Sequence, residues 1–337
     1  MQAMHGTSPL FDEASQQTYG RSADVLRRMN GVGAMEQGSG NPAADHVRAV
    51  WAVADGQAQP DVAPAIASSW ARSLVDHRID PESTAAPRIL TAEELKDFRD
   101  PVGGMIELGR PVLDRLYALV RKVDYVVLLA DATGVVVDHR GDESRADAFK
   151  HWGLWRGAVW SEAAEGTNGI GTSIVEQRPT TVHCDQHFRG RNITLSCSGA
   201  PIFDPDGRLA AVLDISSMDP TVSEHAHALT LPVVAMAARA LERRLFRERF
   251  ARRRTVSLQR ADGTLPGMML ALDDDARILG ADHPARRLLP IDDATIKAGT
   301  GLKRYFELCP AALRSLLNGQ GFRASRFPAW KPQPRPI

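Results

Sequence analysis

The chain contains 337 residues, which is enough for one large domain or for two to three ordinary ones. Its 41 lysines and arginines balance 41 aspartates and glutamates, so the formal net charge is zero. A chain without excess positive charge has no general attraction to phosphate groups. The composition therefore argues against a protein that binds nucleic acid or an anionic membrane through its overall charge.

The cysteines are too few, and odd in number, for a disulfide framework, because only Cys184, Cys197 and Cys309 are present. This usage fits a reducing cytoplasm. The first eleven residues lack the basic start and apolar stretch of a signal peptide. No apolar run approaches the roughly 20 residues that a helix needs to cross a bilayer. We therefore expect a cytoplasmic protein with no membrane partner.

The first segment, residues 1–45, is rich in Gly, Ser, Gln and Asn and has little periodic apolar content. It is predicted to be a flexible leader with a short helix at Ala23–Met29. A helical region is predicted over residues 46–118, where a capping box at Thr91–Glu94 begins one helix and another runs from about Gly109 to Lys122. The apolar residues at helical spacing in its first part are Val47, Val50, Trp51, Ile66, Trp70 and Leu74.

Two β-hairpins are predicted after the helical region. Tyr125–Ala130 and Val135–Val137 are β-branched, apolar runs around an Asp-Ala-Thr-Gly turn. Leu195–Ile202 and Leu209–Ile215 flank Asp-Pro-Asp-Gly, which is a strong turn signal. A further strand is expected at Thr180–His183. Antiparallel strands with helices before and after predict an α+β fold, with the helices on one face of the sheet.

A long helix is predicted to leave the sheet domain, because the pattern is helical from Thr221 to about Arg252. Two interpretations remain open: the helix packs on its own domain, or it is a signalling helix that pairs with a second copy in a homodimer. The two are compatible, since one stripe can pack while its extension pairs. The coiled-coil-like seam consists of Leu231, Val234, Ala238, Leu241 and Leu245.

A second, smaller unit is predicted over residues 253–325, after the basic break at Arg252–Arg254. Residues 326–337 contain four prolines and resemble an interdomain linker. Two strands around an Asp-rich turn, a short helix and an apolar cluster are expected in the small unit, at Met268–Leu272, Arg277–Leu279, Ala281–Leu289 and Leu302–Phe306.

The residues that point most clearly to a binding site lie in the glycine-rich segment 157–172. Glycines at positions 166, 169 and 171 permit tight backbone geometry at the start of a helix. Thr167 and Asn168 can cap that helix, and its free amides can meet a polar ligand group. The third glycine of a dinucleotide fingerprint is absent and no phosphate-loop motif occurs, so no cofactor is expected.

Three tryptophans lie within nine residues beside this segment, at Trp152, Trp155 and Trp160. They are interpreted either as core packing under the sheet or as an aromatic pocket around a small ligand. In a third alternative the domain serves only dimerisation, and Trp155 or Trp160 fills a collapsed pocket.

A second segment with potential metal ligands and nucleophiles contains His183, Cys184 and His187, and Cys197 lies in a later strand. These four side chains are soft or borderline metal ligands, so a metal or redox sensor is one hypothesis. A cysteine nucleophile beside a histidine is another, although no orienting partner can be identified. Roles in the core or in a pocket lining are favoured, and neither a metal nor an enzyme is expected.

Eight strings of sequence stand out in consistent order over roughly residues 46 to 310. They are Ser69–Ser73, Ile79–Pro81, Trp160–Glu162, Gly166–Gly171, His187–Phe188, Cys197–Ile202, Asp204–Gly207 and Val212–Ser216. Together they resemble the acetoin-catabolism regulators, sigma-54-dependent activators of the Fis group. Cys184 departs from that pattern, because a basic residue is expected there in relatives. The resemblance is specific for the family and not for the ligand.

The resemblance implies a GAF sensor domain over residues 119–252, including the exit helix, and a PAS-like domain over residues 253–325. Relatives continue into an AAA+ ATPase, which remodels sigma-54 RNA polymerase, and into a helix that reads promoter DNA. No motif of either is present here, so contact with polymerase and DNA is expected only through domains outside this chain. The proline-rich end favours a truncated chain over a naturally short regulator.

The resemblance further implies that a small organic effector binds the GAF domain and shifts its conformational populations. A short ketone, hydroxyketone or alcohol is expected; the alternative is the metal or redox sensor. The expected ligand-binding residues are Trp155, Trp160, Glu162, Thr167, Asn168, His187, Phe188 and Cys197.

Overall fold

The computed structural model of the chain describes residues 41–57, 62–258 and 267–306. The helix expected at Ala23–Met29, Cys309 and the proline-rich end lie outside the described residues. The chain divides into two compact units. The first contains residues up to 201 together with 211–238, and the second contains 202–210 together with 239 onward.

The N-terminal region of the first unit is helical, as expected, and begins with α2 (Pro42–Ala54) and α3 (Pro64–Val75). The start of α2 is set locally, because the Asn41 side chain accepts a hydrogen bond from the Ala43 amide. Both helices carry a proline in the first turn, where its missing N–H is tolerated. They pack through a shared apolar cluster that includes Val50, Trp70 and Phe188.

The next helices are α4 (Ala92–Arg99) and α5 (Gly103–Val120), joined by the 3-10 turn η1 (Asp100–Val102). The predicted capping box is present, since Thr91 and Glu94 bond each other's backbone amides. Helix α5 starts six residues before the predicted Gly109, because Met105 and Ile106 already face the core there.

Five strands form the sheet of the first unit, in the order β2-β1-β5-β4-β3. The β1–β2, β1–β5 and β3–β4 pairs are antiparallel. Both predicted hairpins and the predicted single strand are therefore confirmed. The strands are β1 (Tyr125–Asp131), β2 (Val136–Arg140), β3 (Thr180–His183), β4 (Ser196–Phe203) and β5 (Leu209–Ser217).

Short helices lie between the strands, and two more follow the sheet. Helix α8 begins where Asn168 was expected to cap it. The predicted helical stretch after Thr221 is split into two helices, α9 and α10, and α10 continues from the first unit into the second. These helices are α6 (Ala146–His151), α7 (Glu162–Glu165), α8 (Gly169–Glu176), α9 (Glu224–Ala228) and α10 (Thr230–Arg249).

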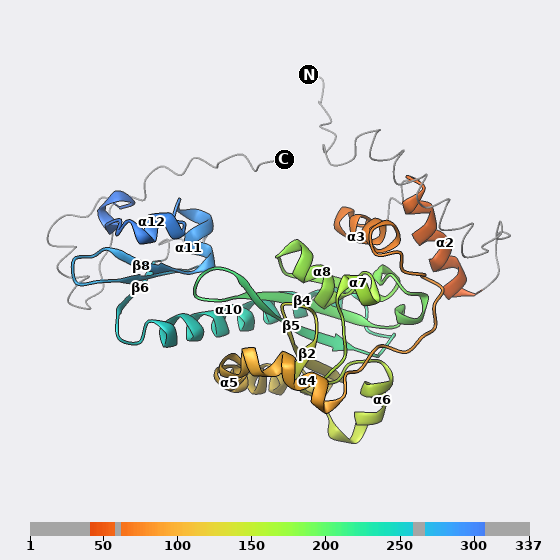
Figure 1. The fold of residues 1–337 in the computed structure, drawn as a ribbon. Helices are drawn as coiled ribbons and strands as arrows, with labels where there is room; N and C mark the ends of the chain where they lie inside the picture. Colours follow the sequence, from red (N-terminus) through yellow and green to blue (C-terminus); the bar gives the residue numbers. More distant parts are fainter. Residues whose placement is uncertain (1–40, 58–61, 259–266, 307–337) are drawn as a thin grey trace. The chain divides into compact units, whose positions relative to one another are not determined.

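Helices cover both faces of this sheet, so the expectation that they lie on one face is wrong. Every residue of β1 is buried, which requires cover on both sides of the strand. Val126 and Leu128 pack with Trp160 and Ile170 on one face. Helix α5 contacts β1 and β2, and Figure 1 shows α7 and α8 on the opposite side of the sheet from α4 and α5.

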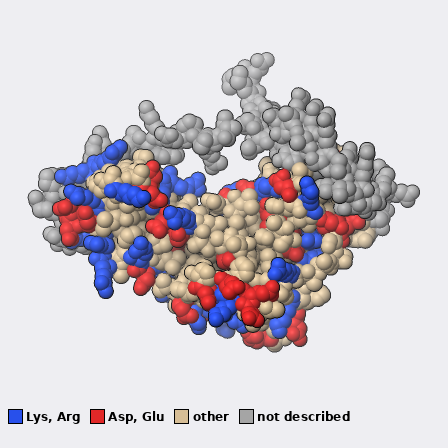
Figure 2. Space-filling model, viewed as in Figure 1, with Lys and Arg blue, Asp and Glu red and all other residues tan. Residues whose placement is uncertain are grey.

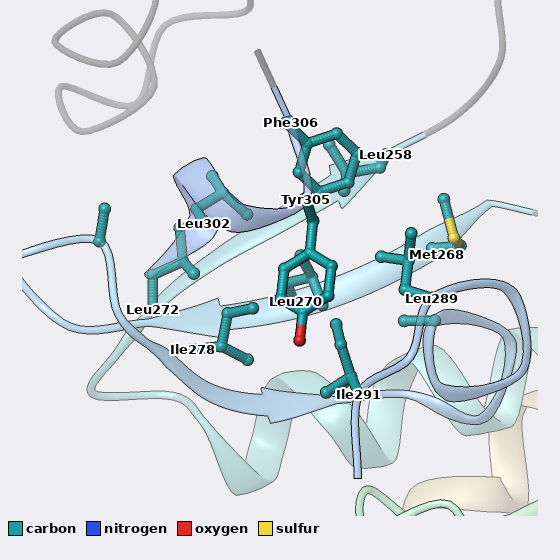
Figure 3. Packing of buried hydrophobic residues seen from close by; sticks show 13 residues of the cluster. Leu258, Met268, Leu270, Leu272, Ile278, Leu289, Ile291, Leu302, Tyr305 and Phe306 are labelled. Carbon is teal, nitrogen blue, oxygen red and sulfur yellow. The ribbon is translucent and has the colours of Figure 1, made fainter. Parts of the chain in front are cut away.

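The second unit contains a three-stranded antiparallel sheet in the order β6-β7-β8. Buried side chains from all three strands meet the helices in one apolar cluster, in which Tyr305 lies close to Leu270 and Ile278 (Figure 3). The elements are β6 (Arg254–Leu258), β7 (Met268–Leu272), β8 (Ile278–Ala281), α11 (His283–Leu288), α12 (Asp293–Lys297) and η6 (Leu302–Arg304).

Strand β6 was not expected, because the basic run 252–254 was interpreted as a break between units. Its residues are mostly half-buried, and β6 pairs only with β7 at the edge of the sheet. An edge strand of this kind has no clear apolar alternation for a sequence pattern to detect. Helix α12 is a five-residue helix that was also not expected.

Charged side chains of both signs are interspersed on the described surface seen in Figure 2, in keeping with the zero net charge. Within the described ranges, no helix combines the length and the apolarity that a membrane span requires.

Candidate functional site

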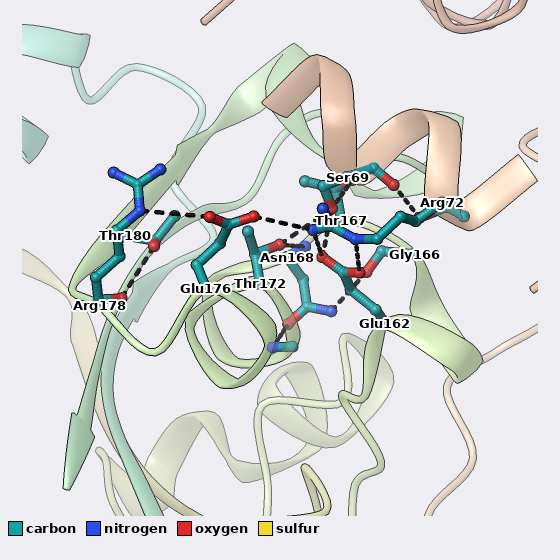
Figure 4. A network of polar contacts seen from close by, with 12 residues as sticks. Ser69, Arg72, Glu162, Gly166, Thr167, Asn168, Thr172, Glu176, Arg178 and Thr180 are labelled. Carbon is teal, nitrogen blue, oxygen red and sulfur yellow. Dashed lines mark hydrogen bonds and ion pairs between the residues drawn. The ribbon is translucent and has the colours of Figure 1, made fainter. Parts of the chain in front are cut away.

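A buried ion pair joins α3 to the glycine-rich segment. The guanidinium of Arg72 donates from Nε to Glu162 Oε2 at 3.0 Å and from Nη2 to Glu162 Oε1 at 2.9 Å. Glu162 is only 3% exposed, so its charge depends on this partner. Arg72 also reaches Glu176 at 3.3 Å, at the other end of α8 (Figure 4). One arginine of α3 therefore holds both α7 and α8.

Ser69, one turn before Arg72, completes the same network (Figure 4). Its Oγ donates to Glu162 Oε1 at 2.5 Å and lies 2.7 Å from Thr167 Oγ1. A hydroxyl has a single proton, so Thr167 is the donor in the second bond. Ser69 is fully buried, as is Thr167. The hydrogen-bonding capacity of these side chains is used within the protein.

Asn168 fixes the start of α8. Its Oδ1 accepts from the Gly171 amide at 2.8 Å, and its Nδ2 donates to the Gly166 carbonyl at 2.8 Å. Gly166 has φ +68°, and a Cβ on it would lie 2.5 Å from Phe188. The tight backbone predicted from the glycines is therefore real. It serves close packing of Phe188 and of the helix start.

A second polar cluster lies between α8 and the sheet, and it contains two of the expected residues. His187 Nδ1 donates to the Cys184 carbonyl at 3.0 Å, which leaves Nε2 as an acceptor 3.4 Å from Cys197 Sγ. Ser216 Oγ is 3.2 Å from the same sulfur and donates to Asp214 Oδ2. All of these side chains except that of Cys184 are almost fully buried.

Burial governs the protonation of this cluster. Desolvation lowers the pKa of His187 to about 3 and raises that of Asp214 to about 7. It also raises the pKa of the Cys197 thiol far above its usual range, and desolvation raises that of Cys184. Neither cysteine is a thiolate near neutral pH, so the geometry does not supply the nucleophile of the enzyme hypothesis.

Asp214 and Ser216 are the members of the cluster that were not predicted from the sequence, and Asp214 is the more informative one. Its side chain is 1% exposed, and its Oδ1 has no hydrogen-bond partner among the described residues. A Cβ on Gly169 would lie 2.7 Å from Asp214 Oδ1 and 2.7 Å from Cys197 Cβ, so the first turn of α8 covers this carboxyl directly. An acidic residue inside an apolar strand, Val212-Leu-Asp-Ile-Ser216, was the available signal.

The four side chains of the metal hypothesis are not gathered at one point. His183 Nδ1 bonds Ser196 Oγ at 2.8 Å, while His187 is turned toward Cys197. Among the described residues there is no group of three or more His, Cys, Asp or Glu side chains that could hold a metal ion. Within the part of the chain that the structure describes, no contact favours the metal alternative.

The tryptophans divide between core and surface. Trp160 is buried and donates from Nε1 to the Gly153 carbonyl at 2.7 Å, in the apolar cluster under the sheet. Trp155 is half-buried, packs against the tilted His139 ring with 3.9 Å between the ring centres, and has the Lys150 ammonium 5.2 Å from its own ring centre. Of the eight expected residues, Trp155 is the one that lines the cavity beside α4.

That cavity, of about 830 Å³, lies between α4, the start of α5 and the loop before Ala158. Glu162, Thr167 and Asn168 belong to the α3 network, and His187 and Cys197 belong to the cluster beneath α8. Trp160 and Phe188 lie in two different apolar clusters. The expected set is therefore not gathered at a single site. The cavity is lined by Ile89, Leu90, Ala92, Leu95, Lys96, Arg99, Asp100, Gly103, Ile106, Glu107, Lys150, Trp155 and Arg156.

Comparison with protein families gives a match over residues 42–239 to a family described as "MimR, N-terminal domain". The match covers the helices and the sheet of the first unit.

Curated relatives are transcriptional regulators, not enzymes. The acetoin catabolism regulatory protein of Cupriavidus necator is 34% identical over 72% of this chain and 37% of its own length. The acetoin dehydrogenase operon activator AcoR of Bacillus subtilis is 29% identical over 67% of this chain and 36% of its own length. The propane 2-monooxygenase operon activator MimR of Mycolicibacterium smegmatis is 30% identical over 48% of this chain and 27% of its own length. The chain thus spans little more than a third of the first two relatives.

A similar fold occurs in the crystal structure of the Escherichia coli DhaR(N)–DhaL complex. That likeness covers 77% of this chain and 87% of the other, with a TM-score of 0.51 and 17% sequence identity. At this identity the likeness concerns the fold alone. It agrees with the GAF-like arrangement of a five-stranded antiparallel sheet with helices.

The substitution Arg72→Met is expected to destabilise the first unit by about 3 kcal/mol, because it leaves the Glu162 charge buried without its partner. Urea unfolding followed by circular dichroism measures the loss. The matched control is Arg110→Met, which breaks an exposed pair with Glu107 at 2.8 Å and is expected to change stability by less than about 1 kcal/mol. Equal effects of the two substitutions would contradict a structural role for the buried pair.

Asp214→Asn is expected to raise the free energy of unfolding more at pH 8 than at pH 5. The difference between its effects at the two pH values is expected to be about 1–3 kcal/mol. The folded-state pKa of Asp214, about 7, lies above the unfolded value of about 4, so the folded state holds the proton more tightly. The native carboxyl therefore lowers stability progressively as pH rises from about 4 to 7, and the amide cannot. Chemical unfolding of both proteins at the two pH values tests this; a pH-independent difference would contradict it.

Proposed function

The chain belongs to the MimR N-terminal domain family, and on that premise we propose that it is the sensory region of a sigma-54-dependent transcriptional activator. It binds a small organic effector in the first unit and passes the signal to an AAA+ ATPase and a DNA-binding domain outside this chain. A cytoplasmic location follows from that role. Among the described residues, the observation that carries the sensory proposal is the buried Asp214 carboxyl with one unpartnered oxygen beneath a covering helix.

The effector is a short ketone, hydroxyketone or alcohol. Two of the relatives are named for acetoin, which is a hydroxyketone, and a third for a propane monooxygenase operon. A hydroxyl group on such a molecule would donate to Asp214 Oδ1, which lacks a partner within the described structure. Satisfying a buried polar atom of this kind contributes about 1–3 kcal/mol. His187 and Cys197 form the polar surroundings of the same carboxyl.

Entry of an effector beneath α8 requires that helix to move, because its first turn lies directly on Asp214 and Cys197. Movement of α8 strains the bond of Arg72 to Glu176, the last residue of that helix. Effector binding therefore acts against the α3 network, and the two arrangements compete as populations. A change of output from 1:99 to 99:1 needs about 5.5 kcal/mol of differential affinity. The covered state, with α3 bonded, is the effector-free one.

Two stretches of chain lead from the first unit into the second and carry the signal. One is α10, and the other is the turn between β4 and β5, residues 202–210. Within the second unit the Phe203 ring stacks on His283 at 3.5 Å, and the Phe203 amide donates to Glu242 Oε1 at 2.9 Å. Arg239 joins Glu242 to Asp282, the cap of α11. We assign the second unit as the PAS-like relay on these contacts.

Thermal unfolding with acetoin, acetone and 2-propanol tests the effector proposal. At least one compound is expected to raise the melting temperature of the whole chain in a concentration-dependent way, since a ligand that binds only the folded state stabilises it. Asp214→Asn is expected to reduce that shift, because the amide presents an N–H donor where the carboxyl oxygen accepts a hydrogen bond from the effector's hydroxyl group.

The matched control is Asp219→Asn, an identical change at an exposed carboxyl just beyond β5 whose shift with the effector is expected to equal that of the wild type. No shift by any of the compounds at about 10 mM would contradict the effector class. An equal shift in wild type and Asp214→Asn would place the site elsewhere.

The chain acts as a homodimer through the start of α10 and not through the predicted seam, because Val234, Ala238 and Leu241 of that seam are buried in the structure. Leu229 and Met236, seven residues apart, are 71% and 72% exposed. Met236 belongs to α10 and Leu229 is the residue immediately before that helix, so two exposed apolar side chains near its start are available for pairing with a second copy. Met236→Glu is expected to convert the dimer to a monomer, as measured by sedimentation equilibrium. The control is Val175→Glu, which adds a charge at an exposed apolar residue of α8 and is expected to leave the molecular mass of the dimer unchanged. A monomeric wild type would refute the proposal.

A further inference from the structure

The open cavity beside Trp155 belongs to neither polar network and has a definite chemical character. Its floor is apolar, because Leu90 and Ile106 are buried and the half-buried Leu95 and Trp155 lie beside them. Its volume of about 830 Å³ lies within the range of small-molecule sites, about 300–1,000 Å³. An apolar floor of this size suits a ligand with a hydrocarbon part.

The walls of the cavity are fixed by contacts far apart in the sequence. The Leu90 amide donates to the Gly157 carbonyl at 2.9 Å, and the Val159 amide donates to the Arg88 carbonyl at 3.0 Å. Gly157 has φ +87°, and a Cβ there would lie 2.9 Å from the Leu90 carbonyl oxygen. The connector before α4 is thus held against the loop that carries Trp155. The cavity is a built feature of the first unit.

The rim of the cavity is positively charged. Four cationic side chains line it against two acidic ones, Asp100 and Glu107. Glu107 is already paired with Arg110, which lowers its effect on the rim. Lys96, Arg99 and Arg156 have no ion-pair partner among the described residues. Lys150 completes the four and lies over the Trp155 ring.

We propose that this cavity binds a small organic anion, with the hydrocarbon part on Trp155, Leu95 and Ile106 and the anionic group at the rim. Unpaired cations beside an apolar floor complement a carboxylate or phosphate carried on a short chain. Arg99 and Arg156 offer the planar donors that suit either group. The site involves none of the residues around Asp214. The anion site therefore goes beyond the proposed neutral effector, and each of the two proposals can be refuted without the other.

Calorimetric titration of the full chain with hexanoate, hexyl phosphate and 1-hexanol tests the proposal. Both anions share the hydrocarbon tail, and the tighter of the two identifies the anionic group. At least one is expected to bind with a dissociation constant below about 1 mM and at least about tenfold more tightly than the alcohol. Binding is expected to weaken as salt is raised, because the rim charges are exposed.

The double substitution Lys96→Gln/Arg99→Gln is expected to weaken anion binding at least about tenfold and to leave weak alcohol binding unchanged. Trp155→Phe is expected to weaken all three probes while keeping an aromatic wall that allows folding. The matched control is Arg115→Gln, which removes an exposed charge of α5 outside the cavity and is expected to bind like the wild type.

Several results would overturn the anion site. These are no binding of either anion up to about 10 mM, an affinity for 1-hexanol equal to that for both anions, or an equal loss in the Arg115→Gln control. The neutral effector is measured on the same protein by its Asp214-dependent thermal shift. Loss of that shift with intact hexanoate binding refutes only the effector proposal, and the reverse result refutes only the anion site.

Discussion

The buried charge of Glu162 is the constraint on which the rest of the first unit depends. A carboxylate removed from water must find a partner that compensates its lost hydration. That partner is Arg72, 90 residues earlier in the chain, and Ser69 supplies a further donor. Because α3 provides both, the N-terminal helices are an integral part of the sheet domain. Three of the eight strings that resemble acetoin-catabolism regulators contain residues of this network: Ser69–Ser73, Trp160–Glu162 and Gly166–Gly171.

Burial also determines which chemistry the unit can perform. His187, Cys197 and Asp214 are residue types of a catalytic site, yet desolvation keeps the imidazole neutral and the thiol protonated. What remains is hydrogen bonding and shape, which suit recognition of a small molecule. This agrees with relatives that regulate transcription. A carboxyl that is easily neutralised is also easier to cover with a helix than a permanent charge would be.

The two proposed ligand regions differ in their access to water and in their charge, and each difference matches the charge of the proposed ligand. The cluster beneath α8 is enclosed, so an ion would have to lose its hydration there, and a neutral oxygen compound suits it better. The cavity beside Trp155 is open and has an excess of cationic side chains, so an anion keeps contact with water while it gains those charges. Two sites in one unit provide the conditions for coupling between ligands, which is reciprocal where it exists.

Features set by neighbours in the sequence were predictable. Asp-Pro-Asp-Gly turns the second hairpin, Asn168 caps α8 and Thr91 caps α4, because each acts within a few residues. Only the tertiary structure decided which helices cover which face of the sheet, that edge strand β6 exists, that Trp160 is core while Trp155 lines a cavity, and that Glu162 meets Arg72. Each of these depends on contacts between distant segments, where burial and pairing, rather than local preference, determine the outcome.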